Sequence, residues 1–280
     1  MRSEAFLPTT VRGTLVANDL EAALALSEAA GWNQTAADWT FFIGAGAIGE
    51  RDDSGRLVAT AATLAFGRFG WISMVLVDAG WRHGGLASRL VDASIASLRA
   101  RGVVPVLDAT PAGRPVYAAL GFADGFAFER WERAGAADAL APSGAADAAA
   151  DAGEPARLDS AASGLDRRAW WDEVVRRPGT RTLRDGPSGL ALIREGRRAL
   201  QIGPVVAADE AAAVGLVDRA LATTGDARVF IDVPVERRRL AAHLGAIGFA
   251  RQRPFTRMAL GAPPPPLGAH QFAFAGPEFG

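Results

Sequence analysis

The most informative pattern of apolar and polar positions lies in residues 71–101. Residues 71–77 include a single polar residue, Ser73, and a short apolar run of this kind is typical of a strand covered on both faces. A glycine-containing break follows. The apolar residues after it recur at helical spacing, at Leu86, Leu90, Val91, Ile95 and Leu98. The segment therefore predicts a strand, a tight glycine turn and a helix.

The segments on either side of this unit predict further helices and strands. Residues 14–30 have an apolar stripe at helical spacing, with Asn18 or Asp19 available as the N-cap of a helix. Strands are predicted at residues 41–49, 57–66, 103–109 and 122–131, and a short helix at residues 113–120. The predicted order is a helix, three antiparallel strands, a helix, a strand, a helix and a strand.

A similar order of elements recurs in the second part of the chain. A helix is predicted around Trp170 and Trp171. Strands are predicted at residues 181–183, 189–193, 199–206, 229–233 and from residue 248 onward, with helices at residues 209–222 and 236–244. Gly248-Phe249 occupies the same place in this order as Gly121-Phe122 in the first part. The second part is therefore interpreted as an altered copy of the first.

Two segments lack the pattern of a packed element. Residues 134–154 consist mainly of Ala, Gly, Asp, Pro and Ser, and predict a flexible linker between domains at residues 1–133 and 155–280. Four consecutive prolines at residues 263–266 require an extended backbone. The tail after them predicts a terminal strand, which could pack on either domain or on another subunit, and this leaves a homodimer open.

Composition and charge exclude several classes of function. The 280 residues include no cysteine, which excludes disulfides, thiolate metal sites and a cysteine nucleophile, and the three histidines are scattered, which argues against a metal site. A formal net charge of −1 without a basic block argues against binding to nucleic acid or to a membrane surface. The N-terminus lacks the apolar core of a signal peptide, and no apolar run approaches the length of a membrane span, so a cytoplasmic protein is expected.

The glycine turn after residues 71–77 has the properties of a phosphate-binding loop. A helix N-terminus directs unpaired backbone N–H groups and the positive end of the helix dipole at one point. Glycine is needed there because a Cβ would obstruct the turn and the approach of a phosphate. The sequence has no lysine, so a Walker loop is excluded, and residues 80–85 do not fit the dinucleotide fingerprint. The pattern that fits is R-x-x-G-x-A, at Arg82, Gly85 and Ala87.

This loop, the order of elements and the pattern Tyr117-x-x-x-Gly121-Phe122 together resemble the GNAT superfamily of N-acetyltransferases over residues 10–133. The resemblance implies an α/β (α+β) fold of two tandem GNAT-like domains, each a mixed, mostly antiparallel sheet flanked by helices, with a splayed central strand in the first. It implies acetyl-CoA as cosubstrate and direct attack by an amine. Tyr117 would protonate the leaving thiolate, and a backbone N–H of Leu76 or Val77 would stabilise the oxyanion. The implied coenzyme-binding residues are Leu76, Val77, Arg82, His83, Gly84, Gly85, Leu86, Ala87 and Ser88.

The second domain resembles the C-terminal domain of two-domain GNAT proteins of the YitH type. The matching stretches are Ile202-Gly203-Pro204-Val205, Asp232-Val233-Pro234, Arg257-Met258 and the closing residues 275–280. Its copy of the coenzyme loop is degenerate, because Asp209 and Glu210 stand at the helix start, where they would repel a diphosphate. Leu244 stands in place of the tyrosine. A single coenzyme site, in the first domain, is therefore expected.

The acceptor side of the site is less constrained by the pattern. Trp32, Asn33, Asp38 and Trp39 lie beside a predicted helix end and could line a substrate cleft, or could form a capped turn with aromatic packing. An ammonium acceptor must lose a proton, which a carboxylate or an ordered water can take. The carboxylates that position allows are Asp38, Asp78, Asp108, Asp124 and Glu129.

Three functions are consistent with these patterns. The first is an acyltransferase, namely an acetyl-CoA-dependent N-acetyltransferase acting on a small-molecule amine, with the second domain walling the substrate cleft. The second is an acetyl-CoA-binding sensor or partner module without turnover. The third is an acyltransferase that uses another acyl-CoA or an O-nucleophile.

Overall fold

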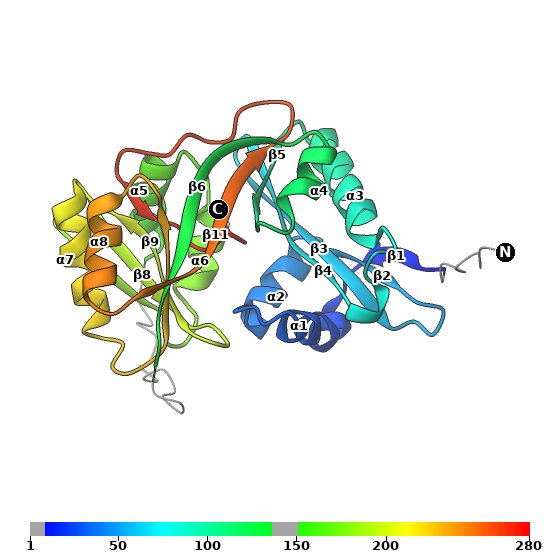
Figure 1. The fold of residues 1–280 in the computed structure, drawn as a ribbon, viewed down its shortest axis with the longest axis horizontal. Coiled ribbons are helices and arrows are strands. Elements are labelled where there is room, and N and C mark those ends of the chain that lie inside the picture. Colours follow the sequence, from blue (N-terminus) through cyan, green and yellow to red (C-terminus); the bar gives the residue numbers. More distant parts are fainter. Residues whose placement is uncertain (1–8, 136–150) are drawn as a thin grey trace.

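The strands of the chain form one continuous sheet that runs through both halves of the molecule (Figure 1). The computed structural model describes residues 9–135 and 151–280. In these residues the strands lie in the order β1-β2-β3-β4-β5-β11-β6-β10-β9-β8-β7, and β12 pairs with β9 outside this path. The β4–β5 and β9–β10 pairs are parallel and the other pairs are antiparallel. This mixed, mostly antiparallel sheet with flanking helices confirms the predicted fold class.

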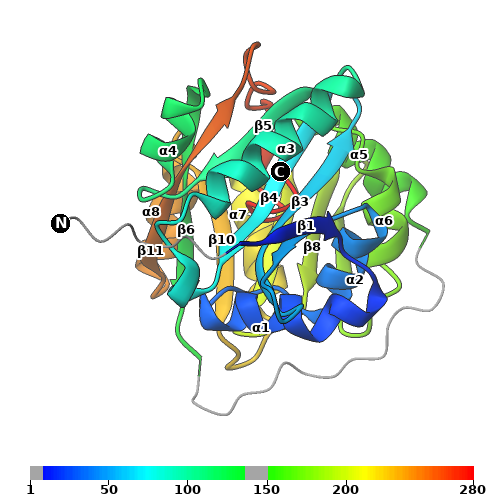
Figure 2. The same ribbon diagram turned by 90° about the vertical axis from the view of Figure 1, so that its right-hand side faces the viewer.

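The first half packs helices on both faces of its part of the sheet (Figure 2). The apolar residues of α1 and α2 contribute to a core on one face, and those of α3 to a core on the other. In chain order its elements are β1 (Val11–Thr14), η1 (Ala17–Asp19), α1 (Leu20–Ala29), α2 (Ala36–Gly44), β2 (Ile48–Arg51), β3 (Leu57–Phe66), β4 (Phe69–Val77), η2 (Ala79–Trp81), α3 (Leu86–Ala100), β5 (Val104–Ala109), α4 (Arg114–Ala119) and β6 (Ala123–Arg133).

The second half repeats the order of three strands, helix, strand, helix and strand. Its elements are α5 (Gly153–Ser163), α6 (Arg168–Val174), β7 (Arg181–Asp185), β8 (Gly189–Arg194), β9 (Leu200–Val206), α7 (Glu210–Leu221), β10 (Val229–Pro234), α8 (Arg238–Ala246), β11 (Ala250–Ala259) and β12 (Gln271–Ala273). The tail after the four prolines forms β12, which pairs with β9 of its own half. Among the helices of the described ranges, none combines the length and the apolar character needed to cross a bilayer.

The two halves are joined by a reciprocal exchange of strands. β6 of the first half lies between β10 and β11 of the second (Figure 2), and β11 lies between β5 and β6 (Figure 1). Each exchanged strand carries an ion pair with the residue directly opposite: Arg257 with Asp108 at 2.9 Å, and Arg130 with Asp232 at 2.7 Å. These four side chains are buried or nearly so, so separating the halves would leave unpaired charges in the interior. The exchange therefore makes one structural unit of the two halves.

The structure differs from the sequence prediction at residues 41–49. The strand predicted there is wrong, because α2 extends to Gly44 and β2 begins only at Ile48. Thr35 and Asp38 form a capping box at the start of α2, and this T-x-x-D spacing was the available signal. Helix α5 was not predicted, and the helix predicted from residue 14 begins as the short turn η1 after strand β1. Most of the predicted linker, residues 136–150, lies outside the described residues.

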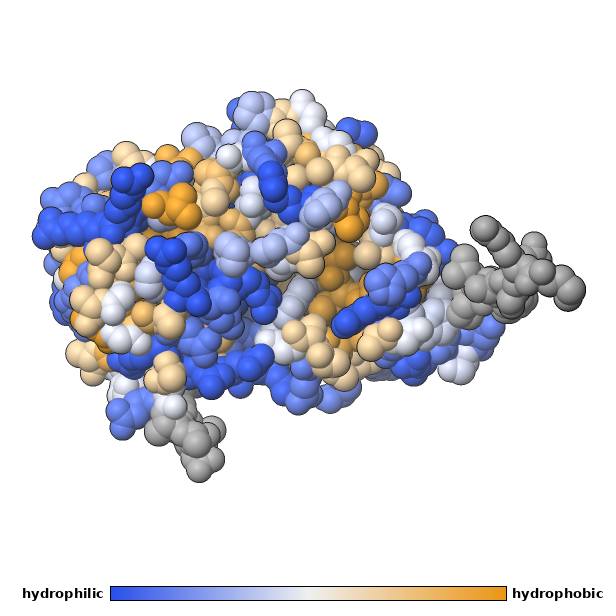
Figure 3. All heavy atoms as spheres, viewed as in Figure 1, coloured by the Kyte–Doolittle hydropathy of each residue, from blue (hydrophilic) through white to orange (hydrophobic). Residues whose placement is uncertain are grey.

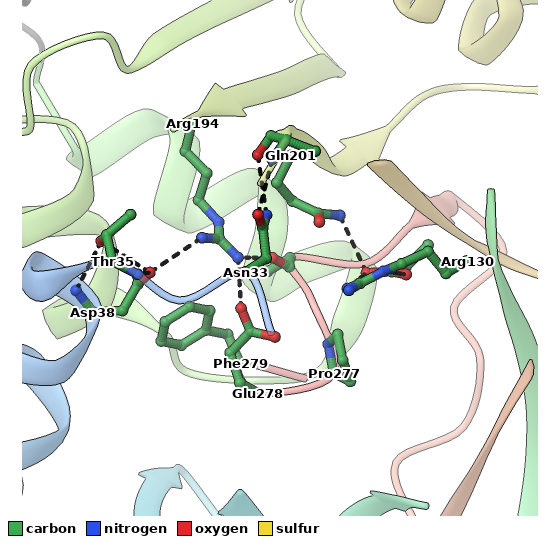
Figure 4. Close-up of polar contacts among 12 residues, drawn as sticks. Asn33, Thr35, Asp38, Arg130, Arg194, Gln201, Pro277, Glu278 and Phe279 are labelled. Atoms are coloured by element: carbon green, nitrogen blue, oxygen red, sulfur yellow. Dashed lines mark hydrogen bonds and ion pairs between the residues drawn. The ribbon is translucent and has the colours of Figure 1, made fainter. Parts of the chain in front are cut away.

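A buried ion-pair cluster fastens α2 of the first half to the second half (Figure 4). The carboxylate of Asp38 is fully buried, accepts a hydrogen bond from Arg177 Nη1 at 2.6 Å and lies 3.6 Å from Nη1 of Arg194. Burial alone would raise the pKa of Asp38, but the two guanidinium groups and the Thr35 N–H lower this pKa below its usual value. The ionised carboxylate therefore stabilises the contact between the halves.

Replacing Asp38 with Asn is expected to lower the free energy of unfolding by about 2 kcal/mol at neutral pH, because two buried arginines lose a charged acceptor. Since the pKa of Asp38 is lower in the folded than in the unfolded protein, its stabilisation is present above the unfolded pKa and is lost as the pH falls through the folded pKa. Urea unfolding from about pH 7 down to about pH 3 should show a smaller acid-dependent loss of stability in Asp38→Asn than in the wild type. The same pH dependence in both proteins would contradict this role.

Candidate active site

The two central strands of the first half, β4 and β5, separate after three residue pairs. Residues Phe69, Gly70 and Trp71 pair in parallel with Val104, Pro105 and Val106. Beyond this point β5 pairs with β11 on its other side, whereas β4 continues to Val77. The edge of β4 that faces β5 therefore presents backbone N–H and C=O groups with which an extended ligand can pair, as an added strand would.

A bulge in β4 lies where this separation begins. The register between β3 and β4 shifts just after the Ala62–Ser73 pair, and Met74 has a φ of 53°. The hydroxyl of Thr60 donates to the Met74 carbonyl at 2.9 Å and holds this conformation. A left-handed backbone at a residue other than glycine is strained, by an amount on the order of 1–3 kcal/mol, and such strain is concentrated at functional sites. The strain points to a function for this part of β4.

The loop after β4 leads into α3 without a side-chain cap. Gly85 is the N-cap, with a φ of 77°, and no acidic residue lies in the first turn. The N–H of Arg89 donates to the Gly85 carbonyl, so the N–H groups of Leu86, Ala87 and Ser88 have no partner within the helix. Together with the positive end of the helix dipole, these groups have an arrangement that can bind an anion. The predicted binding of a diphosphate at this loop is compatible with this geometry and stays a prediction.

The remaining residues of the predicted coenzyme site flank this helix start. Arg82 and His83 are exposed, and His83 has a φ of 65°. Arg82 Nε donates to the Val77 carbonyl at 3.3 Å, which ties the loop to the end of β4. Leu76 is buried and lies opposite Thr60 of β3. The predicted coenzyme residues therefore lie along the end of β4 and the start of α3.

A cavity of about 320 Å³ opens between the two halves, next to the separated strands. Figure 3 shows apolar surface in a hollow between the halves. The first half contributes residues from the α1–α2 connection, β4, β5, α3, α4 and β6, and the second half contributes β10, β11 and the C-terminal tail. The lining includes Trp32, Asn33, Gln34, Ile72, Ser73, Met74, Val75, Ala87, Asp108, Thr110, Tyr117, Phe230, Arg253, Phe255, Pro277 and Glu278.

Tyr117 lines this cavity from α4. Its ring packs over Gly113, where a Cβ would lie 2.9 Å from Cε2 of the tyrosine. The ring also packs edge-to-face on Phe122, with 6.2 Å between the centroids. Burial raises the pKa of the Tyr117 hydroxyl above its usual value. The phenol therefore keeps its proton at neutral pH and can donate it to a leaving group in the cavity.

Two of the four predicted acceptor residues, Trp32 and Asn33, line the cavity. Asn33 is buried and bonded to the second half. Its Oδ1 accepts from the N–H groups of Arg198 and Ala199 at 2.9 and 3.0 Å, and its Nδ2 donates to the Ala199 carbonyl at 3.0 Å. Because these bonds occupy the amide, Asn33 positions the α1–α2 connection. Of the two residues, Trp32 therefore has the side chain that is freer to contact a substrate.

The other two predicted acceptor residues lie in the interior, away from the cavity. Asp38 belongs to the ion-pair cluster at the start of α2. Trp39 is fully buried, and its indole N–H donates to the hydroxyl of Ser27 at 2.9 Å. Neither lines the cavity, so the second interpretation of this segment, a capped turn with aromatic packing, accounts for both of them.

The carboxylates considered as a base are all paired with arginines. The four that do not line the cavity are Asp38 with Arg177, Asp78 with Arg56, Asp124 with Arg114, and Glu129 with Arg251. Asp108 does line the cavity, but both of its oxygens accept from Arg257, each at 2.9 Å. Burial raises the pKa of Asp108 against the opposing effect of Arg257. In the described part of the chain, no group of three or more potential metal ligands comes together.

Polar residues other than the predicted site residues also line the cavity, and three of them have an oxygen without a partner within residues 9–135 and 151–280. Gln34, Ser73 and Glu278 are buried, and among the described residues Gln34 Oε1, Ser73 Oγ and Glu278 Oε2 have no hydrogen-bond partner. The sequence held a signal for two of these residues: Ser73 is the single polar residue of the predicted strand, and Gln34 adjoins the predicted site residue Asn33. Glu278 had none, because nothing local in the sequence places the C-terminal tail at the cavity.

The corresponding gap in the second half is filled by the chain itself. β9 and β10 also pair in parallel over only three residue pairs, which end at Ile202 and Ile231. β12 then lies against β9, and the N–H of Phe274 donates to the Asp232 carbonyl of β10 at 2.9 Å. The tail therefore bridges these two strands at the place where the first half is open.

The helix that follows β9 is capped by its own sequence. Asp209 Oδ1 accepts from the N–H of Ala212 at 2.9 Å, and Glu210 lies in the first turn of α7. Asp209 thus satisfies one of the N–H groups to which an anion would bind, and both carboxylates would repel an anion there. Leu244, at the place of Tyr117, is buried in the core.

Comparisons with known proteins agree with this geometry. A family model described as the acetyltransferase (GNAT) family matches residues 18–122, and one described as an acetyltransferase (GNAT) domain matches residues 156–273. A search of curated proteins found no match to the chain. The two GNAT matches lie in the two halves of the molecule.

Solved structures share the fold along most of the chain. A Pyrococcus horikoshii protein assigned provisionally as an acetyltransferase has a TM-score of 0.80 at 18% identity, over 100% of this chain and 99% of its own. A GCN5-related N-acetyltransferase from Sphaerobacter thermophilus has a TM-score of 0.61 at 15% identity, over 89% and 95%. One from Kribbella flavida has a TM-score of 0.56 at 17% identity, over 90% and 71%. With both halves matched by GNAT models and the fold shared throughout, the chain belongs to the GNAT acetyltransferases, carries two GNAT domains in tandem, and is an acyltransferase.

Proposed function

We propose that this protein is an acetyl-CoA-dependent N-acetyltransferase that acts on a small-molecule amine and binds the coenzyme in its first half only. The observation that carries the proposal is that Val75 of β4, Ala87 of α3 and Tyr117 of α4 line one cavity. A free strand edge, an anion-binding helix start and a proton donor thus meet where an acyl thioester would need all three. The cavity of about 320 Å³ suits a small acceptor.

Each part of the site has a separate task in this proposal. The N–H groups at the start of α3, with Arg82 and His83 beside them, bind the diphosphate. The free edge of β4 at Leu76 and Val77 pairs with the pantetheine arm, and a backbone N–H there stabilises the oxyanion. Acetyl-CoA supplies the activated acetyl group. Tyr117 gives a proton to the departing thiolate.

The second half supports the cavity without a coenzyme of its own in this proposal. Its strand gap is occupied by β12, and its helix start is capped by Asp209. The proposed units of sequence are the domains at residues 1–133 and 155–280, and α5 begins at Gly153, within the last two residues of the predicted linker 134–154. The exchange of β6 and β11 then means that neither unit completes its sheet alone.

Calorimetric titration with CoA, followed by a turnover assay with a panel of amines, tests this proposal. One coenzyme is expected to bind per chain, and thiol should be released from acetyl-CoA only when an amine is present. The protein has no cysteine, so a thiol reagent reports the coenzyme alone. Failure to bind CoA would refute the proposal. Binding without turnover for any acceptor would favour a sensor, and turnover with alcohols or with other acyl-CoAs would favour the third function.

A further inference from the structure

Glu278 lines the cavity with a buried carboxylate that the fold pairs through one of its two oxygens. Glu278 is 4% exposed, and its Oε1 accepts from Arg194 Nη2 at 2.7 Å (Figure 4). Its Oε2 has no hydrogen-bond partner among the described residues. A buried carboxylate oxygen without a partner is unfavourable, so a ligand that donates hydrogen bonds there is expected.

The C-terminal tail fixes the position of Glu278. Phe279 is fully buried and stacks on Phe42 of the first half and against Trp170 of the second, each with 5.3 Å between ring centroids. On the other side, the Pro277 carbonyl accepts from the Trp71 indole N–H at 3.1 Å. Trp71 is the last residue of β4 that pairs with β5. The tail therefore holds Glu278 beside the point at which the two strands separate.

The charges that face Glu278 leave it able to accept a cation. They are Arg194 on β8 and Arg130 on β6, with Asp38 on α2 beyond Arg194, and Arg253 of β11 lines the same cavity. Arg194 is shared with Asp38, and Arg130 is held by Asp232 through two hydrogen bonds at 2.8 and 2.7 Å. Since Arg194 and Arg130 are both shared with other carboxylates, Glu278 keeps negative charge with which an ammonium group can pair.

Two more residues that line the same cavity have a buried oxygen without a partner among the described residues. Gln34 Oε1 and Ser73 Oγ belong to side chains that are 4% and 9% exposed. An alkylammonium group has three N–H donors and no acceptor, which suits three oxygens of which one is charged. A hydroxyl has one donor and no charge, and would leave most of this set unsatisfied.

We propose that Glu278 binds the ammonium group of the acceptor and takes the proton that its nitrogen must lose before attack. This inference depends on the proposed function and deepens it, because the acceptor is then a primary amine that enters as a cation. One proton passes from nitrogen to Oε2, and the freed lone pair forms the bond to the acetyl carbon as the carbon–sulfur bond breaks. The nitrogen loses its second proton after attack, and this proton restores the one that Tyr117 gives to the thiolate, so the reaction releases the single proton held by Glu278. Asp108, the other acid on the wall, is occupied by Arg257.

The test is Glu278→Gln, with Glu173→Gln as the matched control. The amide that the first substitution introduces cannot act as a base, so kcat/KM for the amine should fall by about 10²–10³-fold and KM should rise, with the Kd for CoA unchanged. The ascending limb of the pH–rate profile should move toward the pKa of the free amine, so that alkaline pH restores activity. Glu173 pairs with Arg177 of the same cluster, but its side chain is 38% exposed and lies outside the cavity. Glu173→Gln should keep the wild-type constants and profile.

The two proposals fail in different ways. If the wild type acetylates an amine and Glu278→Gln has the same KM and pH profile, the assignment of Glu278 is overturned, while the proposed function stands. If the wild type does not bind CoA, the proposed function itself fails.

Two further variants test the assignment if Glu278→Gln does not fold. Glu278→Asp keeps the charge beside Arg194, and Gln34→Leu removes one oxygen without touching an ion pair. Each should raise KM for the amine about fivefold or more at unchanged coenzyme affinity, and no effect from either would overturn the assignment.

Discussion

Replacing Tyr117 with Phe is expected to lower kcat for amine acetylation by about 10²–10⁴-fold, while the Kd for CoA changes by less than about twofold. The substitution removes only the hydroxyl, so the ring can still pack over Gly113 and against Phe122. The departing thiolate then has no positioned proton donor. Release of the coenzyme thiol measures kcat, and calorimetry measures the coenzyme affinity.

The pH dependence adds an independent check on Tyr117. Because burial raises its pKa, the hydroxyl stays protonated through the neutral range, and the rate should not fall through loss of this proton below about pH 10. Phe122→Leu is a matched control, because it changes the packing of the same ring but removes no proton, and it should keep activity within about threefold. Full activity in Tyr117→Phe would show that solvent protonates the thiolate.

The sequence predicted correctly those elements in which a single pattern of apolar residues dominates. The apolar runs of β3 and β4 and the helical spacing of α3 agree with the structure to within two residues. The segment of Phe41, Phe42 and Ile43 was misassigned because a short apolar run is equally compatible with a strand and a buried helix. Its helix is decided by the capping box before it, Thr35 with Asp38, which satisfies backbone N–H groups that a strand would not leave free.

The strand exchange could not be predicted from local pattern. An antiparallel strand such as β6 or β11 has the same alternation whichever strand it pairs with, so its partner is decided by contacts distant in the chain. The pair of Asp108 and Arg257 joins residues 149 positions apart, and no periodicity relates them. The same limit applies to the acceptor site. The loop from Arg82 to Ser88 is contiguous and therefore visible in the sequence, whereas Glu278 reaches the cavity only because Phe279 is anchored in a core shared by both halves.

Replacing Gly85 with Asp is expected to weaken CoA binding by about 100-fold or more, because a carboxylate would then face the diphosphate at the start of α3. This change copies into the first half the acid that caps α7 in the second, Asp209. Asp adopts a positive φ more readily than most residues, so the turn at Gly85, with its φ of 77°, should be retained. Calorimetry with CoA measures the affinity, and circular dichroism of the variant checks that the fold is kept.

The reverse substitution, Asp209→Gly, is the matched control and tests why the second half lacks a coenzyme. It removes the capping carboxylate from α7 at a cost of a few tenths of a kcal/mol, yet β12 still occupies the space between β9 and β10. The stoichiometry should therefore stay at one CoA per chain. A second CoA bound by Asp209→Gly would mean that the acid, and not the tail, closes this gap. Unchanged affinity in Gly85→Asp would mean that the diphosphate does not bind at the start of α3, and the placement of the coenzyme would have to be abandoned.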